Sequence, residues 1–133
     1  MTYLLDTNSC IEYLNERNST VARRLDNVTR DQVVVCSVVK AELLHGAQKY
    51  GNRERRLRIL AETFAPYASL PFDDTAAAAY ANIRHELESA GNVIGPNDLM
   101  IAAIAQANIL TLVTHNTAEF GRVPSLQVED WQT

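Results

Sequence analysis

The sequence contains little cysteine and tryptophan and no long apolar segment. Its 133 residues include 2 cysteines and 1 tryptophan, and no apolar run reaches the ~18 residues that a membrane-spanning helix requires. The first residues lack the basic and apolar regions of a signal peptide. We therefore expect a cytoplasmic protein without a membrane partner. Its length predicts a single domain over residues 1–133 that needs no disulfide or metal to fold.

Several kinds of catalytic site are also missing. Cys10 and Cys36 are too few for a disulfide framework, and neither has a second cysteine or a histidine at zinc-binding spacing, so we expect two buried, reduced thiols. The chain has no His-Glu-x-x-His, no G-x-S-x-G, no P-loop and no glycine-rich dinucleotide turn. These absences argue against zinc-protease, serine-hydrolase and nucleotide-binding chemistry. We predict His85 and His115 at the surface.

The charge is acidic overall but unevenly distributed. The net charge is −4, yet residues 1–58 hold ten of the 12 lysines and arginines against seven acids, which gives +3. Residues 59–133 hold two arginines against nine acids, which gives −7. A basic half of this kind can contact phosphates while the whole chain stays negative. The alternative is a set of solvated helical faces, and charge alone does not decide between them.

Short apolar runs predict the strands of a sheet. Residues 33–36 are continuous and β-branched, which is typical of a strand covered on both faces, and residues 3–5 and 109–113 read in the same way. Residues 68–72 predict an edge strand, because Pro71 cannot donate to a ladder. A last short strand is predicted within 125–129.

Helical patterns separate these strands. Cap residues at 6–9, at Ser37 and at 73–75 predict the starts of three helices, the last of them over 76–89. Apolar spacing predicts further helices from Ser19 and over 53–64 and 99–107. In the helix over 53–64, Leu57, Leu60, Ala61 and Phe64 are expected to face inward. Alternating strands and helices predict an α/β fold, a three-layer α/β/α sandwich with a short, mostly parallel sheet.

Acidic and polar residues recur where strands end. The carboxyl ends of parallel strands meet at one edge, where functional groups gather. Acids that converge there repel one another unless a cation lies between them, and oxygen ligands suit Mg²⁺ or Mn²⁺, which promote phosphate-ester hydrolysis. The side chains predicted at this edge are Asp6, Glu42, Asp98, Thr114, Asn116 and Glu119.

Each acid also has a purely structural interpretation. Asp6 and Asp98 can serve only as helix caps, and Glu119 can be a loop acid. Glu42 is harder to explain in this way, since it stands in the mostly apolar row 38–44, next to a buried face. The residues alone leave the choice between caps and a metal site open.

Four segments, 4–8, 37–46, 94–102 and 113–120, resemble the motifs of PIN-domain ribonucleases, and specifically the VapC toxins of bacterial type II toxin–antitoxin systems. The four occur in the family's order and cover essentially the whole chain. The resemblance implies a PIN fold and an endoribonuclease that cleaves structured RNA such as tRNA and thereby inhibits translation. It also implies a VapB-type antitoxin partner and either a homodimer or a heteromeric complex.

The resemblance further implies that Asp6, Glu42 and Asp98 bind Mg²⁺ or Mn²⁺. This chain has Asn116 where many PIN domains carry a fourth acid, and Glu119 is the candidate replacement. Asn116 and Glu119 are then catalytic residues of the outer shell, and whether one or two ions bind stays open. Thr7 and Asn8 are expected to donate to phosphate or to these carboxylates.

Two other classes of protein compete with this interpretation. A receiver-like phosphotransfer domain also gathers acids around Mg²⁺, but it needs paired acids after the first strand and a late lysine, and no lysine follows Lys49. A non-catalytic PIN-fold binding module, regulated by an antitoxin-like partner, would keep the fold without the cleavage. The intact Asp6, Glu42 and Asp98 argue against it.

Two surfaces have open interpretations. The basic segments 53–56 and 23–24 can guide the RNA backbone, contact an antitoxin or simply be solvated. Ile11, Tyr13, Leu14 and the helix over 37–50 can line a groove for an amphipathic antitoxin helix or belong to the core, and for most of them we favour the core.

Overall fold

Five parallel strands form one sheet in the computed structural model, which describes residues 2–133. The strand order is β3-β2-β1-β4-β5, so β1 lies in the centre and β3 at an edge, as predicted. The strands are β1 Tyr3–Leu5, β2 Val33–Cys36, β3 Ala68–Leu70, β4 Thr111–Val113 and β5 Val128–Glu129.

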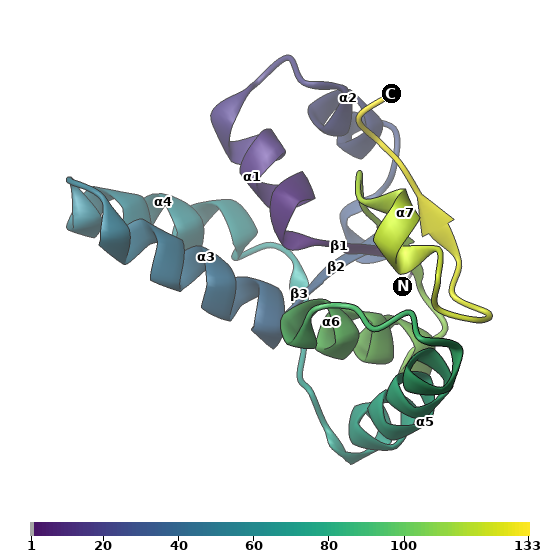
Figure 1. Ribbon diagram of the computed structural model, residues 1–133. Coiled ribbons are helices and arrows are strands. Elements are labelled where there is room, and N and C mark those ends of the chain that lie inside the picture. The colour runs from purple at the N-terminus through teal and green to yellow at the C-terminus, as the bar shows by residue number, and fades with distance from the viewer. Residues whose placement is uncertain (1) are drawn as a thin grey trace.

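Helices connect the strands and lie on both sides of the sheet (Figure 1). In that view α1 and α2 lie above the sheet and α5 and α6 below it, which confirms the three-layer α/β/α fold. The helices are α1 Thr7–Asn15, α2 Thr20–Asp26, the 3₁₀ turn η1 Arg30–Gln32, α3 Ser37–Lys49, α4 Arg53–Phe64, α5 Asp74–Ala90, α6 Pro96–Ala107 and α7 Thr117–Phe120. Among residues 2–133, no helix combines the length and the apolar character needed to cross a membrane.

The core is formed by the central strands and the helices against them. All four residues of β2 and all three of β4 are buried, as expected for parallel strands covered on both faces. Cys10 and Cys36 are buried and unpaired, as predicted, and burial raises the pKa of both thiols. His85 and His115 are exposed, also as predicted.

Side-chain hydrogen bonds confirm the caps predicted at Asp6 and Asp73 and add a third at Ser19, where a helix was predicted to start. Asp6, Ser19 and Asp73 each accept from the backbone amide three residues later, at 2.8, 3.1 and 2.9 Å. Such caps supply partners for amides that the helix leaves unpaired. The cap predicted at Ser37 is wrong, because Cys36 is the last extended residue and β2 runs directly into α3.

Several element boundaries differ from the prediction. Helix α5 begins at Asp74 instead of 76, and α6 begins at Pro96 instead of 99, because proline suits the first helical position. Residue 109 was predicted in a strand, but Ile109 has φ +56° and is 91% exposed. It closes α6, since its amide donates to the carbonyl of Gln106 at 3.2 Å. Strand β5 is shorter than its predicted range.

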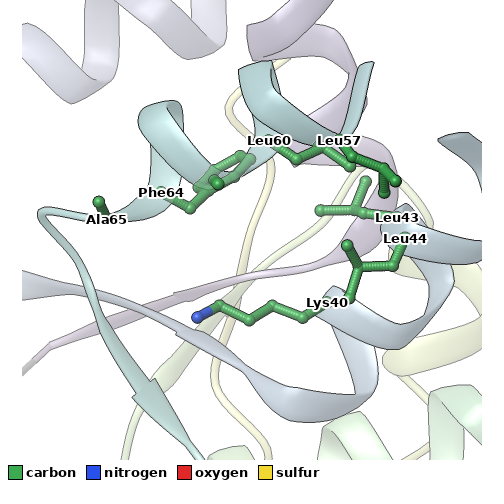
Figure 2. Close-up of a pocket in the computed structure, with 8 residues that line it drawn as sticks. Lys40, Leu43, Leu44, Leu57, Leu60, Phe64 and Ala65 are labelled. Carbon is green, nitrogen blue, oxygen red and sulfur yellow. The ribbon is translucent and has the colours of Figure 1, made fainter. Parts of the chain in front are cut away.

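Helices α3 and α4 form a hairpin that projects from the rest of the molecule (Figure 1). Leucines of both helices face each other across an apolar groove (Figure 2). Phe64 is buried and Leu57 and Leu60 are half-buried, but Ala61 is exposed, contrary to prediction, because only α3 covers this face of α4. The core preference is likewise wrong for Ile11, which is 40% exposed, whereas Tyr13 and Leu14 pack against the core.

Candidate active site

The register of the sheet brings the first two polar residues together. Strands β1 and β4 are parallel neighbours, with Leu5 opposite Val113. Asp6 follows β1 and Thr114 follows β4, so both residues lie at the same edge of the sheet. The amide of Asp6 still donates to the carbonyl of Val113 at 3.0 Å. The predicted meeting of strand ends is therefore built into the sheet itself.

Asp6 is buried and tightly held. Its side chain is 4% exposed and accepts from the amide of Ser9 at 2.8 Å. Burial raises the pKa of Asp6, and hydrogen bonds from Thr114 and Ser9 oppose that rise. The cap interpretation of Asp6 is confirmed, and it is compatible with a site at this edge, because the capping carboxyl group lies there.

Ser9 is a residue of this edge that the sequence analysis did not single out. It is 1% exposed, and its hydroxyl donates to the carbonyl of Val113 at 3.2 Å. Through this bond Ser9 ties the first turn of α1 to β4. Its place three residues after a capping aspartate was the available signal, since the third residue of a helix faces the cap.

Glu42 reaches the edge from α3. Its Oε1 accepts from the hydroxyl of Thr7 at 2.6 Å, across 35 positions of sequence. Of the two roles expected for Thr7, donation to a carboxylate is the one that the structure contains. Asn8 is exposed. The hydrogen bond fixes Glu42 beside the start of α1, and hence near Asp6.

Asp98 and Glu119 form a coupled pair of carboxyl groups. Burial, followed by the charges of Glu119, Glu42 and Asp6 in that order, raises the pKa of Asp98 to about 7. The pKa of Glu119 is lowered, first by the backbone amide of Gly95. Asp98 therefore carries the proton in their mutual hydrogen bond near neutral pH.

Glu119 is anchored by two other groups. It accepts from the amide of Gly95 at 3.0 Å and from the side-chain amide of Asn116 at 2.6 Å. A Cβ added at Gly95 would lie 3.8 Å from Asp98 and 3.9 Å from Glu119, so both carboxyl groups lie against this glycine. The loop interpretation of Glu119 is wrong, because it belongs to the short helix α7. The sequence analysis also missed the Gly95 amide, since backbone donors leave no mark in a sequence.

The donor set suits a hard divalent cation, although the side chains are not arranged around one. All four acids are oxygen donors, and three of them raise the pKa of the fourth, which is the electrostatic condition that a cation relieves. Within residues 2–133, however, no three histidine, cysteine, aspartate or glutamate side chains form a group that could hold a metal ion as they stand. Glu42 faces Thr7 instead, and Asp98 is paired with Glu119.

Comparison with known proteins identifies the family. The family model described as the PIN domain matches residues 3–126. The chain is 37% identical over 131 residues to the tRNA(fMet)-specific endonuclease VapC of Shigella flexneri, with 98% of each chain covered. This chain belongs to the VapC family of PIN-domain proteins. A second VapC relative, ribonuclease VapC2 of Rickettsia felis, is 35% identical over 132 residues, with 98% of each chain covered.

Solved VapC structures share the fold over nearly the full chain. The crystal structure of VapBC2 from Rickettsia felis bound to a DNA fragment from their promoter matches with a TM-score of 0.92 and 34% identity, covering 98% of this chain and 99% of that one. The DNA-bound VapBC of Salmonella typhimurium matches with a TM-score of 0.93 and 34% identity, with 98% of each chain covered. The resemblance drawn from the four sequence motifs is confirmed, and with it the assignment to endoribonucleases over a phosphotransfer domain. PIN-domain ribonucleases generally depend on a divalent metal.

Proposed function

We propose that this VapC-family protein is a Mg²⁺-dependent endoribonuclease toxin that hydrolyses structured RNA, with tRNA as its substrate class, and so inhibits translation. A VapB-type antitoxin binds it and blocks its activity in the cytoplasm, in a homodimer or a heteromeric complex. Residues 1–133 act as a single nuclease domain. The names of the relatives support the enzyme and the substrate class, and their solved complexes with VapB support the partner.

One observation carries the catalytic part of the proposal. Acids that follow β1 or lie on α3, α6 and α7 meet at a single edge, where burial first and then the other three acids raise the pKa of Asp98 to about 7. The cap of α1 explains why Asp6 is present but not why three further acids lie beside it, since each unpaired charge at this edge costs free energy. A cation-dependent site accounts for the arrangement.

The side chains divide into ligands and supports. Asp6, Glu42 and Asp98 would hold Mg²⁺ or Mn²⁺, which supplies positive charge against the phosphate oxygens and makes water a better nucleophile when bound. Glu42 orients the attacking water and accepts its proton. Asn116 holds Glu119 by a hydrogen bond, and Glu119 in turn positions Asp98. The hydroxyl of Thr7 holds Glu42 in the absence of a metal ion. Glu42 must turn from Thr7, and Asp98 must lose its proton to the solvent, before both can serve as ligands.

The proposed reaction is a hydrolysis. A bond forms between the water oxygen and phosphorus while the bond from phosphorus to the 3′ oxygen breaks, and the 3′ oxygen takes up a proton. The products carry a 5′-phosphate and a 3′-hydroxyl, because the 2′-hydroxyl of the RNA is not the nucleophile. These ends distinguish the mechanism from that of metal-independent ribonucleases.

The test is cleavage of defined RNA pools by pure protein free of antitoxin. Total tRNA and ribosomal RNA are incubated with Mg²⁺, with Mn²⁺ and with EDTA, and the same reactions are run with Asp98→Asn. We expect discrete fragments with 5′-phosphate ends that require the metal and disappear in the variant. Folded protein that binds Mg²⁺ and leaves every RNA intact would instead establish the binding-module alternative.

A further inference from the structure

The tip of the α3–α4 hairpin carries the densest positive charge of the chain. Residues 49–58 include five cations and one acid, which gives +4, while the remaining residues sum to −8. All five cations are exposed. We call them the tip cations: Lys49, Arg53, Arg55, Arg56 and Arg58.

No ion pair neutralises the tip cations. The two ion pairs within residues 2–133 are Arg84 with Glu88 and His115 with Asp130, and both lie outside the hairpin. Arg56 is partly used internally, because its Nε donates to the carbonyl of Gly51 at 2.9 Å and its guanidinium lies 5.5 Å from the centre of the Tyr50 ring. The other four cations remain available to an external anion.

Three of these cations share one hollow. Arg53, Arg55 and Arg58 line a surface depression at the start of α4 together with Asn52, Glu54 and Leu57. Leu60 and Phe64 use another face of α4 to line the apolar groove against α3, and Leu57 lies between the two surfaces (Figure 2). The hairpin therefore separates its apolar contacts from a cationic outer surface.

The hairpin is continuous with the candidate active site. Helix α3 begins directly after β2 and carries Glu42 in its second turn, and the same helix ends at Lys49. At a rise of 1.5 Å per residue, the tip lies about 10 Å or more along the axis from Glu42. Figure 1 shows α3 and α4 extending together away from the sheet. A nucleic acid bound at the edge must span at least this distance to reach the tip, which takes about three nucleotides at about 3.4 Å each, so a minimal oligonucleotide at the cleavage site leaves the tip empty.

We propose that the tip cations bind the phosphate backbone of the RNA substrate outside the cleavage site and so favour large structured RNAs over short ones. The proposal rests on the proposed ribonuclease function. Charge complementarity selects the occupant, because RNA carries regularly spaced phosphates and the rest of this chain is acidic. The contacts are to phosphate, so they contribute affinity and position without reading bases.

The test compares two triple variants with the same loss of charge. Arg53→Gln/Arg55→Gln/Arg58→Gln removes the three positive charges that line the hollow and leaves the internally bonded Arg56 in place. Arg17→Gln/Arg30→Gln/Arg84→Gln removes three exposed arginines outside the hairpin. Both are made in the Asp98→Asn background for equilibrium titrations with total tRNA from 50 to 200 mM KCl. Each is also made in the otherwise unchanged chain for cleavage assays.

We expect the hairpin triple to bind tRNA about 10- to 100-fold more weakly at 100 mM salt. Its plot of log affinity against log salt should be shallower by about 2, since each lost phosphate contact removes about 0.7. The control triple should lose less than about threefold, because any effect of net charge alone is small at this salt. In the catalytically active chain, the hairpin triple should keep the parental kcat/KM on a minimal oligonucleotide that carries the cleavage site, because this substrate does not reach the tip. Its kcat/KM on tRNA should fall.

Several results would overturn the proposal. Equal losses in the two triples would reduce the effect to net charge, and no loss in the hairpin triple would remove the tip from the RNA interface while leaving the nuclease intact. Unchanged tRNA binding with weakened binding to a VapB-type antitoxin would assign the tip to that partner. If the parent protein neither bound nor cleaved tRNA, both this proposal and the proposed function would fail.

Discussion

The carboxyl edge of the sheet and the tip of the hairpin are built on opposite principles. At the edge, hydrogen bonds from Thr7, Ser9 and Asn116 hold Glu42, Asp6 and Glu119 at 2.6 to 2.8 Å, and the bond from Thr7 to Glu42 joins residues 35 positions apart. At the tip, exposed cations stand outside the ion pairs found within residues 2–133. Fixed side chains suit chemistry that depends on position, whereas an exposed charge suits a partner recognised through its electrostatic field. The difference can be tested from either side.

We expect the largest effect on RNA cleavage from a change to the carboxyl group of Asp98 at the edge. Replacing the Asp98 carboxyl by an amide in Asp98→Asn removes a proposed metal ligand, and we expect cleavage to fall by at least about 100-fold, since even changes to groups behind the ligands cost about 10- to 100-fold. Binding of tRNA through the hairpin should persist. Single-turnover cleavage and a binding titration measure the two quantities separately.

The matched control is Asp26→Asn, the same chemical change at an exposed position at the end of α2. It should leave both quantities unchanged. Cleavage by Asp98→Asn at the parental rate would remove Asp98 from the site.

Glycine-to-alanine substitutions compare how well the two regions accept an added methyl group. Gly121 lies beside the edge and Gly46 lies in the hairpin. A Cβ at Gly121 would lie 2.5 Å from the carbonyl oxygen of Thr117, so Gly121→Ala must displace the end of α7 and with it Glu119. We expect a loss of about 1–3 kcal/mol in the free energy of unfolding, together with slower cleavage. Gly46 has open space around it inside α3, so Gly46→Ala should add about 0.5–1 kcal/mol.

Urea unfolding measures both free energies, and cleavage of tRNA shows whether the change reaches the site. Equal stability in the two variants would mean that α7 adjusts freely and that Glu119 is not held as tightly as its hydrogen bonds imply.

Acidity should affect the edge more than the hairpin. The pKa of Asp98 is about 7 in the folded protein, above the 3.8 that is ordinary for an aspartate. The protonated carboxyl group therefore stabilises the fold fully below about pH 4, and this stabilisation is lost as the pH rises to about 7. Burial raises the pKa of Asp6 as well, with the same sign. Glu119 has the opposite sign, but its lowered pKa acts below 4.5.

In EDTA we therefore expect the melting temperature to fall between pH 5 and pH 7.5. The corresponding change in the free energy of unfolding is about 1 kcal/mol, since Asp98 is only half-buried and water screens its charge. Asp98→Asn should flatten this dependence, and Mg²⁺ should reduce it in the parent protein. A melting temperature that rises over the same range in EDTA would contradict the assignment of the shared proton.

The smallest expected effect lies outside both regions. Ile109 adopts φ +56° where a left-handed backbone closes α6, a position that favours glycine because a β-branched side chain is strained there. Ile109→Gly should stabilise the protein by about 1 kcal/mol without changing cleavage. Val93→Gly, at a 56% exposed residue with ordinary backbone, should instead destabilise it slightly. Urea midpoints compare the two, and a gain in both would mean that relief of strain is not the cause.

What the sequence predicted well was local. The caps at Asp6, Ser19 and Asp73 depend on an amide three residues away, so their pattern is visible in a short window. The buried strand of β2 was visible because β-branched residues fill it completely. The carboxyl-edge rule then placed Asp6, Glu42 and the residues after β4 on one side of the sheet.

The features that the sequence did not predict depend on contacts with other parts of the fold. The apolar run that starts at Ile109 looks like a strand, but the end of α6 determines its backbone. Helix α7 was missed because its position depends on Glu119 binding an amide 24 residues earlier, at Gly95. The pairing of Glu42 with Thr7, in place of a ready metal cluster, likewise results from three-dimensional packing.

The double use of Asp6 has a consequence for cells that carry this gene. Its carboxyl group caps α1 and also forms the buried part of the proposed site. A mutation that disarms the toxin at Asp6 therefore also removes a helix cap, at a cost of about 1 kcal/mol in stability. Such losses lower the amount of folded protein that survives proteolysis. Escape at Asp6 would thus yield a scarcer protein, whereas escape at Asp98 would leave an abundant, inactive copy that still occupies the antitoxin.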